Sequence, residues 1–411
     1  MLRREFLRGW QRKGILGRGK GMEKRIGIIM NGVTGRMGSN QHLTRSILAI
    51  RKDGGVPMKD GSVLMPEPLL IGRNEAKLRA MAERHGGLQW STDLRTALQN
   101  KDYPVYFDSG TTVMRERNVL DALAAGKNVY CEKPLSVDTA GAVRLAEAAE
   151  RAGALHGVVQ DKLFLPGIRK MRRLVESGFF GKILSVRGDF GYWIFEGNWG
   201  VCGQRPSWNY RKEDGGGIIL DMFAHWRYLL DHTFGSIRSV QCLGATHVPE
   251  RVDENGTTYT CTADDAAYAT FELEGGIVAQ INSSWTTRVY RDELFVIQVD
   301  GTHGSAIAGL TGCKTQHRIN TPRAVWNPDV PNQIDFRADW QEVPDAAHFD
   351  NAFRVQWEMY LRALVEGTSF VHDFWDGARG VQLAEIAMQS SKERRWLDIP
   401  PLRNEGAHGA F

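Results

Sequence analysis

Two short groups of residues, about ninety positions apart, have side chains suited to moving a proton and stabilising an oxyanion. Lys133 stands in Glu132-Lys133-Pro134, directly after a strand-like run, where an ammonium group can donate to a developing alkoxide. Asp221 and His225 stand four apart in a helix-like run, so they share one helix face. Their neighbours are apolar, so both side chains are expected to be buried, which is costly for a carboxylate and an imidazole unless they have a function or a partner. One such function is acid–base catalysis by the imidazole, oriented by the carboxylate. A satisfied core pair is the alternative.

A glycine-rich turn upstream is suited to a phosphate group. The turn follows a short apolar strand and precedes a helix, where backbone amides and the positive end of the helix dipole attract a pyrophosphate. Its spacing, G-x-x-G-x-x-G, is one residue longer at the first turn than the usual G-x-G-x-x-G. We interpret the turn as the cradle of a dinucleotide, formed by Gly32-Val33-Thr34-Gly35-Arg36-Met37-Gly38.

The end of the second strand bears on which nicotinamide cofactor the chain prefers. An NAD site usually places Asp or Glu there to accept from the ribose 2′-hydroxyl. This chain has Gly72-Arg73-Asn74 at that place, without a carboxylate, and Arg73 can pair with a 2′-phosphate. The cofactor is therefore NAD or NADP, with a slight preference for NADP. Ser109-Gly110-Thr111, after a later strand of the same edge, and Glu132 with Lys133 complete the predicted cofactor contacts.

Alternating strands and helices predict a parallel sheet in the first part of the chain. Strand-like runs at 25–30, 69–73, 105–109, 128–131 and 155–160 alternate with helical runs at 36–51, 75–85, up to 125 and 140–152. Residues 53–68, rich in Gly and Pro, are expected to form a loop. We assign residues 1–23 to a disordered basic extension and 24–158 to an NAD(P)-binding Rossmann domain.

The pattern changes near residue 159. Helical runs at 163–177, 217–230, 351–366 and 377–394 flank longer alternating runs at 183–190, 239–246, 266–273, 277–284 and 294–300. Such alternation is typical of an antiparallel sheet with one exposed face. We therefore expect a second α+β domain at 159–400, with an open, mostly antiparallel sheet that binds substrate and forms a homodimer or homotetramer.

An aromatic and cationic segment, together with one lysine, provides candidate substrate contacts. Residues 190–212 contain seven aromatic side chains, which pack well against the C–H faces of sugars, although a packed loop or a subunit interface has the same composition. From this segment we select Trp199 and Arg205. Lys162, soon after the last strand of the first domain, is a further candidate beside Asp221 and His225.

Composition and charge exclude several classes of protein. Residues 1–25 contain nine basic and two acidic side chains, and the remainder is slightly acidic, so no nucleic-acid surface is expected. No apolar run is long enough for a bilayer. The five cysteines are scattered and never form C-x-x-C, which fits a reducing compartment. The N-terminal Arg3-Arg4 lacks the apolar stretch of an export signal, so we expect a cytoplasmic protein. No third ligand at motif spacing accompanies Asp221 and His225, so no metal is expected.

Taken together, these segments resemble the Gfo/Idh/MocA (glucose–fructose oxidoreductase, inositol dehydrogenase) family over nearly all of the chain after residue 24. The run 122–134, ending in Glu132-Lys133-Pro134, is similar to that family's hallmark segment, and 215–225 is similar to its catalytic helix. The resemblance implies a Rossmann domain, an oligomerising α/β domain, and Lys133, Asp221 and His225 as catalytic residues. Where the family has Thr-Pro-Asn, this chain has Ser109-Gly110-Thr111.

The expected function is therefore NAD(P)-dependent oxidation or reduction at a secondary hydroxyl of a sugar, sugar acid, cyclitol or glycoside. His225 takes the hydroxyl proton, Lys133 steadies the alkoxide, and Asp221 orients the imidazole or holds an adjacent hydroxyl. One alternative is an NAD-dependent oxidoreductive glycosidase, in which transient oxidation permits elimination and the cofactor is then restored. A second alternative is a nucleotide-binding sensor without turnover.

Overall fold

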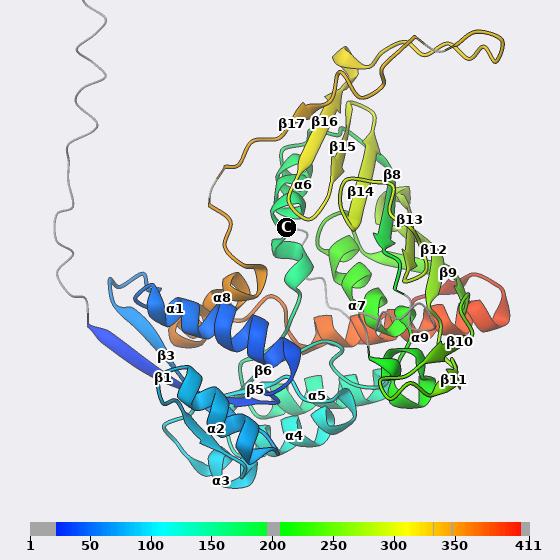
Figure 1. Ribbon diagram of the computed structural model, residues 1–411. Helices are drawn as coiled ribbons and strands as arrows, with labels where there is room; N and C mark the ends of the chain where they lie inside the picture. The colour runs from blue at the N-terminus through cyan, green and yellow to red at the C-terminus, as the bar shows by residue number, and fades with distance from the viewer. Residues whose placement is uncertain (1–21, 195–205, 332, 347, 404–411) are drawn as a thin grey trace, which may run out of the picture.

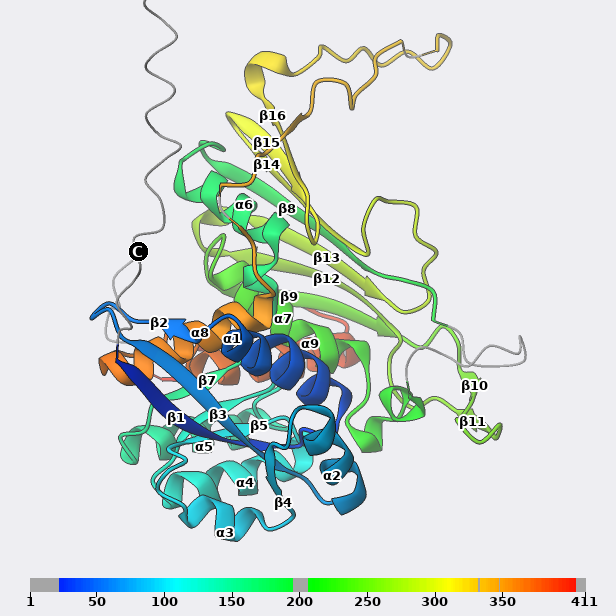
Figure 2. The ribbon, with the colours of Figure 1, turned by 60° about the vertical axis from the view of Figure 1, so that its left-hand side comes forward.

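The computed structural model describes residues 22–194, 206–331, 333–346 and 348–403. Two lobes make up this part of the chain: a lower one built on a parallel sheet with helices on both faces, and an upper one built on a large second sheet (Figures 1 and 2). Helices α8 and α9 lie between the lobes in both views. Among the described residues, no helix has the length and apolar character needed to cross a membrane.

The first sheet confirms the Rossmann prediction, because its central strands run parallel in the order β3-β1-β5-β6-β7, with β2 and β4 beside β3. β1 (Glu23–Asn31) is buried on both faces, as parallel strands covered by helices are. The other strands are β2 (Val56–Pro57), β3 (Val63–Ile71), β4 (Gln89–Ser91), β5 (Val105–Asp108), β6 (Asn128–Cys131) and β7 (His156–Val158). The helices are η1 (Met37–Leu48), continued by α1 (Ala49–Lys52), then α2 (Glu75–Arg84), α3 (Leu94–Gln99), α4 (Thr112–Ala124) and α5 (Thr139–Arg151).

The expectation of a loop at 53–68 is wrong at its C-terminal end. β3 begins at Val63 and pairs with β1 along nine residues, while β2 forms a short antiparallel pair with its start. Pro66 and Pro68 are tolerated because β2 reaches only Leu64 and β4 begins to pair at Leu69, so no outer neighbour needs their missing amide protons. On the same outer side of β3, the carbonyl of Pro66 accepts a hydrogen bond from Arg51 Nη1, at 2.7 Å.

The second domain contains a nine-stranded sheet in the order β17-β16-β15-β14-β8-β13-β12-β9-β18, antiparallel except where β13 runs parallel to β8. This confirms the predicted open, mostly antiparallel sheet. Its longer strands are β8 (Ile183–Gly191), β9 (Ile237–Ala245), β12 (Ala266–Leu273), β13 (Val278–Ser284) and β14 (Phe295–Gly301). The short ones are β10 (Glu250–Val252), β11 (Thr258–Thr260), β15 (Gly304–Ala308), β16 (Cys313–His317), β17 (Gln341–Glu342) and β18 (Leu397–Asp398), of which β10 and β11 form a separate pair.

Helices cover one face of this sheet and tie it to the first domain. The α-helices of this half are α6 (Pro166–Glu176), α7 (Ile218–Asp231), α8 (Ala352–Glu366) and α9 (Phe374–Glu393). The same half also contains five described 3₁₀ turns, namely η2 (Asp161–Phe164), η3 (Ser207–Tyr210), η4 (Lys212–Asp214), η5 (Glu274–Gly276) and η6 (Arg318–Asn320). α8 places Trp357 and Tyr360 in the core on one face of the parallel sheet, and α9 places Trp375 and Ala378 in the core on the other. The two C-terminal helices therefore hold the lobes together through apolar burial.

Candidate active site

The glycine turn after β1 lies against the turn after β5. Gly32 has φ +75°, and a Cβ on it would come within 2.5 Å of the Gly110 backbone nitrogen. A Cβ on Gly38 would come within 2.5 Å of Ser109 Oγ. The Ser109 hydroxyl in turn donates to the carbonyl of Asn31, at 2.9 Å. Glycine is therefore required at both positions for two backbone segments to meet at the carboxyl edge of the sheet.

Gly35 differs from the other two glycines, because its missing Cβ leaves open space. A Cβ there would have only the Gly32 carbonyl oxygen within 4 Å, at 3.3 Å, so the middle of the turn is free for a ligand's approach. A helix begins directly afterwards at Met37, with no side-chain cap and no acidic side chain in its first turn. These features fit the pyrophosphate of a dinucleotide.

The predicted ribose contacts lie at the end of β3. The Arg73 side chain is exposed there, and Asn74 caps α2 by accepting from the amide of Lys77 at 2.9 Å. A Cβ on the intervening Gly72 would have Thr34 of the glycine turn within 3.4 Å, so this end of β3 adjoins the turn. Asn74 thus has a structural function as a helix cap, while Arg73 remains available to a ligand.

A buried arginine that the sequence analysis did not select holds two of the predicted turns together. Arg115 of α4 is 2% exposed and pairs with the buried Asp108 at the end of β5, at 3.2 Å. Its guanidinium also donates to the carbonyls of Gly110, at 3.0 Å, and of Pro134. One cation therefore fixes the turn after β5 relative to the Glu132-Lys133-Pro134 segment after β6.

Glu132 is a buried carboxylate held by an imidazole from the first helix. His42 Nε2 lies 2.7 Å from Glu132 Oε1, and Trp357 Nε1 of α8 donates to His42 Nδ1 at 3.0 Å. Burial alone would raise the pKa of Glu132, but the hydrogen bond from His42 and the nearby Lys133 charge bring it below its ordinary value. Glu132 also accepts the Lys133 amide at 3.1 Å, so it shapes the turn that presents the lysine.

Lys133 and Asp221 meet, although they stand 88 residues apart and come from different domains. Lys133 Nζ lies 2.7 Å from Asp221 Oδ1 and donates to the Asp221 backbone carbonyl at 2.9 Å. Both side chains are partly exposed, at 18% and 25%. The pair therefore stays accessible to a substrate and keeps an ammonium beside the start of α7.

The start of α7 is set by glycines and by an aspartate. Asp264 accepts from the backbone amide of Ile219 through its side chain at 2.8 Å, and from that of Ile218 through its carbonyl at 3.0 Å. Gly217 has φ +116°, and a Cβ there would come within 2.9 Å of Asp264 Oδ1. The glycines before α7 thus allow Asp264 to cap it, and the cap places Asp221 in the first turn and His225 in the second.

His225 is 4% exposed, and its Nδ1 contacts residues that the sequence analysis missed. Nδ1 lies 2.6 Å from the hydroxyl of Tyr228 and 3.8 Å from Asp161 Oδ1. Asp161 is buried and immediately precedes the predicted Lys162, whose ammonium lies 2.5 Å from its other oxygen. Lys162 is therefore brought to the site but is paired with a carboxylate. The signal that could have found Asp161 in the sequence is its position directly before Lys162, which was already a candidate.

The aromatic segment is only partly described. Trp199 and Arg205 lie outside the described residues. Trp208 is exposed, whereas Tyr210 is buried with the guanidinium of Arg251 over its ring, at 3.9 Å. Tyr210 belongs to the core of the second domain, and Arg251 pairs with the buried Asp265 at 3.1 Å. At Tyr210 the segment is therefore packed into the core, which agrees with the alternative of a packed loop.

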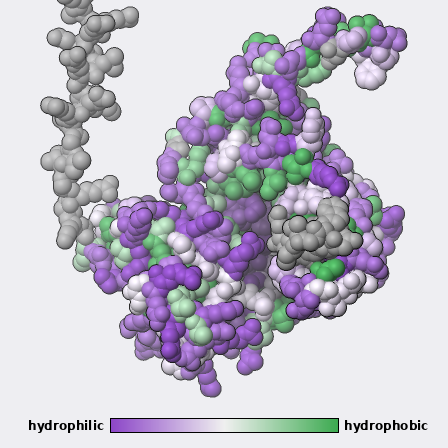
Figure 3. Space-filling view, viewed as in Figure 1, coloured by the Kyte–Doolittle hydropathy of each residue, from purple (hydrophilic) through white to green (hydrophobic). Residues whose placement is uncertain are grey.

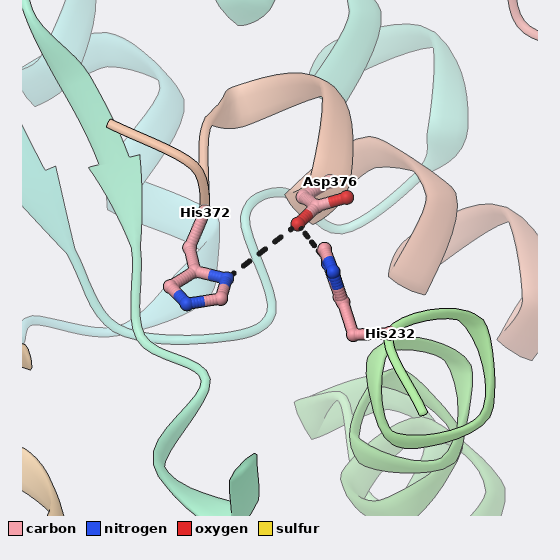
Figure 4. Close-up of side chains that lie close together, drawn as sticks. All are labelled: His232, His372 and Asp376. Atoms are coloured by element: carbon pink, nitrogen blue, oxygen red, sulfur yellow. Dashed lines mark hydrogen bonds and ion pairs between the residues drawn. The ribbon is translucent and has the colours of Figure 1, made fainter. Parts of the chain in front are cut away.

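Three potential metal ligands meet between α7 and α9, away from the residues above. His232, His372 and Asp376 have ligand atoms within 4.8 Å of one another (Figure 4). The carboxylate of Asp376 already accepts from His232 Nε2 at 2.6 Å and from Gln160 Nε2 at 3.1 Å, and its other oxygen pairs with Arg379. These bonds engage Asp376 and His232 in an ion-pair network. His372 Nδ1 lies 3.8 Å from Asp376 and has no hydrogen-bond partner among the described residues, and burial lowers the pKa of His372.

The surface is hollowed where the two lobes meet, and the hollow is largely hydrophilic (Figure 3). A cavity of about 350 Å³ also lies between α6, the segment before α8, and α8 itself. Lys133, Asp221 and His225 do not line it. Its walls combine apolar side chains with charged ones, namely Leu163, Phe164, Arg169, Arg172, Arg173, Glu176, Ala346, Phe349, Val355 and Met359.

A Rossmann sheet with an open glycine turn, and a lysine, an aspartate and a histidine gathered at its carboxyl edge, define a nicotinamide-dependent oxidoreductase. Two family models match the chain: an oxidoreductase family with an NAD-binding Rossmann fold over residues 69–160, and a GFO/IDH/MocA C-terminal domain over 168–307. A D-xylose dehydrogenase from Paenarthrobacter nicotinovorans is 52% identical over 381 residues, which is 92% of this chain and 98% of that protein. The chain belongs to the Gfo/Idh/MocA family of oxidoreductases, and it is an NAD(P)-dependent enzyme.

More distant relatives share the fold. Levoglucosan dehydrogenase from Pseudarthrobacter phenanthrenivorans is 21% identical over 366 residues, 82% of this chain and 91% of that protein. A structure of levoglucosan dehydrogenase with NADH and levoglucosan superposes with a TM-score of 0.74 at 19% identity, over 93% of this chain and 100% of that one. An oxidoreductase domain protein from Kribbella flavida gives a TM-score of 0.72 at 24% identity, over 92% and 100%.

Proposed function

We propose that this enzyme oxidises a hydroxyl-bearing carbon of D-xylose or of a closely similar aldose with NAD(P) as acceptor. The observation that carries the proposal is the 2.7 Å contact between Lys133 Nζ and Asp221 Oδ1, one helical turn from His225 and at the sheet edge that holds the glycine turn. The choice of sugar rests on the name of the relative that shares 52% of its residues.

Each of the three side chains has a distinct part in this reaction. His225 accepts the proton of the substrate hydroxyl. General-base catalysis of this kind accelerates a reaction about 10²–10⁴-fold. Lys133 donates to the same oxygen as negative charge develops there. Asp221 keeps the lysine ammonium in place and accepts from a neighbouring hydroxyl. The bound nicotinamide supplies the hydride acceptor. The proposed chemistry uses no metal ion.

The glycine turn, the turn at Ser109-Gly110-Thr111 and the start of η1 would hold the cofactor. We infer a slight preference for NADP, because the end of β3 offers the exposed cation of Arg73 and no carboxylate at Gly72-Arg73-Asn74. The rest of the Arg73 side chain is free to stack on the adenine in either cofactor.

The test is a substrate screen that measures reduced nicotinamide by absorbance and sugar products by chromatography. We expect D-xylose to be oxidised with accumulation of free NAD(P)H, and His225→Ala to abolish most of that signal. Sugar release from a glycoside without net NAD(P)H would assign the oxidoreductive glycosidase reaction instead. Tight cofactor binding without any change in sugars, cyclitols or glycosides would contradict both reactions.

We propose that the outer face of the second sheet forms the contact of a homodimer or homotetramer. That face exposes apolar side chains from four neighbouring strands, and Leu243 is directly paired with Tyr268 across β9 and β12. The exposed set is Leu184, Leu243, Tyr268 and Val278. Light scattering after size-exclusion chromatography tests this: Tyr268→Glu should shift the mass toward one subunit.

A further inference from the structure

The Nδ1 side of the His225 ring faces a two-residue arrangement from separate parts of the chain. Tyr228 stands on the same helix, one turn later, and its hydroxyl lies 2.6 Å from Nδ1. Asp161 comes from η2, directly after the parallel sheet, and its Oδ1 lies 3.4 Å from the same hydroxyl and 3.8 Å from Nδ1. All three side chains are buried. A carboxylate, a phenol and an imidazole therefore meet at Nδ1, with their polar atoms within 3.8 Å of one another.

Counting protons limits which of these groups donates and which accepts. The Tyr228 oxygen accepts the backbone amide of Lys162 at 3.1 Å, which leaves its own O–H as the one proton it can donate. Burial, and next the negative charge of Asp161, raise the pKa of Tyr228 well above its ordinary value, so it retains this proton. The Asp161 carboxylate is an acceptor only, and its Oδ2 accepts from the Lys162 ammonium at 2.5 Å. Two arrangements fit these contacts. In one, the tyrosine O–H donates to Nδ1 and Asp161 is left to Lys162. In the other, Nδ1–H donates to the tyrosine oxygen and the tyrosine O–H donates to Asp161, and only this second arrangement also holds when the imidazole is protonated, because Nδ1 must then donate.

This arrangement selects one tautomer of the imidazole. If Nδ1 carries the proton, Nε2 has a lone pair and can accept the proton of a substrate hydroxyl. After that transfer the ring is a cation, and the Nδ1–H bond to Tyr228 need not change. The Asp161 charge then stabilises the imidazolium through the tyrosine.

We propose that Tyr228 and Asp161 are positioning residues that hold His225 in the Nδ1–H tautomer and raise its proton affinity at Nε2. The proposal rests on the proposed function of His225 as the proton acceptor. In the transfer, the substrate O–H bond breaks and a bond from hydrogen to Nε2 forms, while the protons on Nδ1 and Tyr228 remain where they are.

Other charged groups around His225 are already engaged with different partners. Asp221, one turn earlier on the same helix, pairs with Lys133, and Glu132 at the end of β6 pairs with His42. Asp264 caps the start of α7. On α9, which packs against α7, Asp376 pairs with His232 just after the last turn of α7 and with Arg379 of its own helix. Among the described residues, Asp161 is thus the carboxylate found within 4 Å of His225 Nδ1, at 3.8 Å.

Histidine NMR tests the arrangement without any substrate. The full-length enzyme with ¹⁵N-labelled histidine, saturated with cofactor, is compared with His225→Gln to assign the signals of His225. We expect the Nδ1–H tautomer in the wild type, a mixture or the Nε2–H tautomer in Tyr228→Phe, and a lowered pKa of His225 in Asp161→Asn. An Nε2–H tautomer in the wild type, or signals that neither variant changes, would overturn the proposal.

The pH dependence of kcat/KM tests its consequence for the reaction. Removing the Asp161 charge lowers the proton affinity of the imidazole, so the rising limb of the profile should move to lower pH in Asp161→Asn. Turnover should fall about 10- to 100-fold in Asp161→Asn and Tyr228→Phe, as is typical when a hydrogen-bond partner that orients a metal-ligating histidine is removed. Asp161→Glu should recover part of it, and cofactor affinity should stay within a few-fold.

Tyr360→Phe is the matched control, since it also removes a fully buried tyrosine hydroxyl, here one that donates to the Leu155 carbonyl at 3.1 Å. It should leave the pH limb and the His225 signals unchanged. If Asp161→Asn and Tyr228→Phe keep both the limb and turnover within twofold, the two residues are structural only. If the wild type oxidises no sugar, the proposed function fails, but the NMR result still decides whether the arrangement exists.

Discussion

Trp357 donates a hydrogen bond from Nε1 to Nδ1 of His42, at 3.0 Å, across 315 residues of sequence. Because the indole N–H is only a donor, Nδ1 must be the acceptor, and the proton of the neutral ring therefore lies on Nε2. That nitrogen is 2.7 Å from Glu132 Oε1, so a residue of α8 fixes the proton that holds the Glu132-Lys133-Pro134 turn. The last helices of the chain thus help to set the position of the lysine.

The first prediction follows from this contact. His42→Leu leaves the Glu132 carboxylate buried without its donor, which should lower the free energy of unfolding by about 1–3 kcal/mol, as measured in urea. His42→Gln, which restores an N–H donor, should recover part of the loss. Because the pKa of Glu132 is lowered in the folded state, its contribution is present above the unfolded pKa and is lost as the pH falls through the folded one. Equal stability of His42→Leu and the wild type at pH 7 would refute the role of this contact.

The second prediction concerns the paired lysine. Lys133→Met should reduce kcat by about 10²–10³-fold, the loss typical of removing one donor to a developing oxyanion. Asp221→Asn should reduce it less, since the Asp221 backbone carbonyl still accepts from Nζ. Steady-state kinetics with D-xylose give both values, and cofactor fluorescence titration shows whether binding is preserved. A rise in KM alone, at constant kcat, would show that Lys133 binds the substrate without stabilising the alkoxide.

The third prediction concerns cofactor preference. Arg73→Ala removes an exposed cation at the end of β3, and should weaken NADP⁺ binding about tenfold while changing that of NAD⁺ by less than twofold. Dissociation constants for the two cofactors, measured by calorimetry, provide the comparison. Equal losses for both would mean that Arg73 stacks on the adenine and does not contact a phosphate. Arg84→Ala, at the exposed end of α2, is a control for the general loss of a surface charge.

The fourth prediction concerns His372 at the domain junction. Burial lowers the pKa of His372 below 6.5, although the Asp376 carboxylate, 3.8 Å from Nδ1, acts in the opposite direction. The unfolded chain therefore binds this proton first, so the free energy of unfolding should fall as the pH drops below about 6.5, with a slope of at most about 1.4 kcal/mol per pH unit from this group. His372→Gln should flatten the wild-type curve between pH 7 and 5, whereas His348→Gln, at an exposed position, should leave it unchanged.

The fifth prediction separates an ion-pair network from a metal site at the same place. Dialysis against EDTA should change neither the melting temperature nor turnover, since Asp376 is engaged by Arg379, His232 and Gln160. Differential scanning fluorimetry with and without Zn²⁺ gives the readout. A melting temperature that falls with the chelator and returns with Zn²⁺, but not in His232→Gln, would assign a metal to His232, His372 and Asp376.

Local patterns predicted the elements that carry the site. The glycine turn, the lysine after a strand, and an acid and a histidine four apart on a helix follow from short-range spacing, as do the alternation that indicated the parallel sheet and the period of two that indicated the second sheet. Prolines in β3 misled the interpretation of residues 63–68, because propensity does not show that a strand edge lacks a neighbour at Pro66 and Pro68.

Sequence by itself therefore determined which groups are chemically competent and which edge of the sheet presents them. Only the tertiary structure decided their partners: Asp221 pairs with Lys133, Tyr228 and Asp161 lie at the Nδ1 of His225, and Trp357 fixes His42. The physical reason is that a buried polar group must find its partner wherever the folded chain brings one. Apart from Tyr228, one turn from His225, these partners stand far away in the sequence, by as many as 315 residues, beyond the reach of any local pattern.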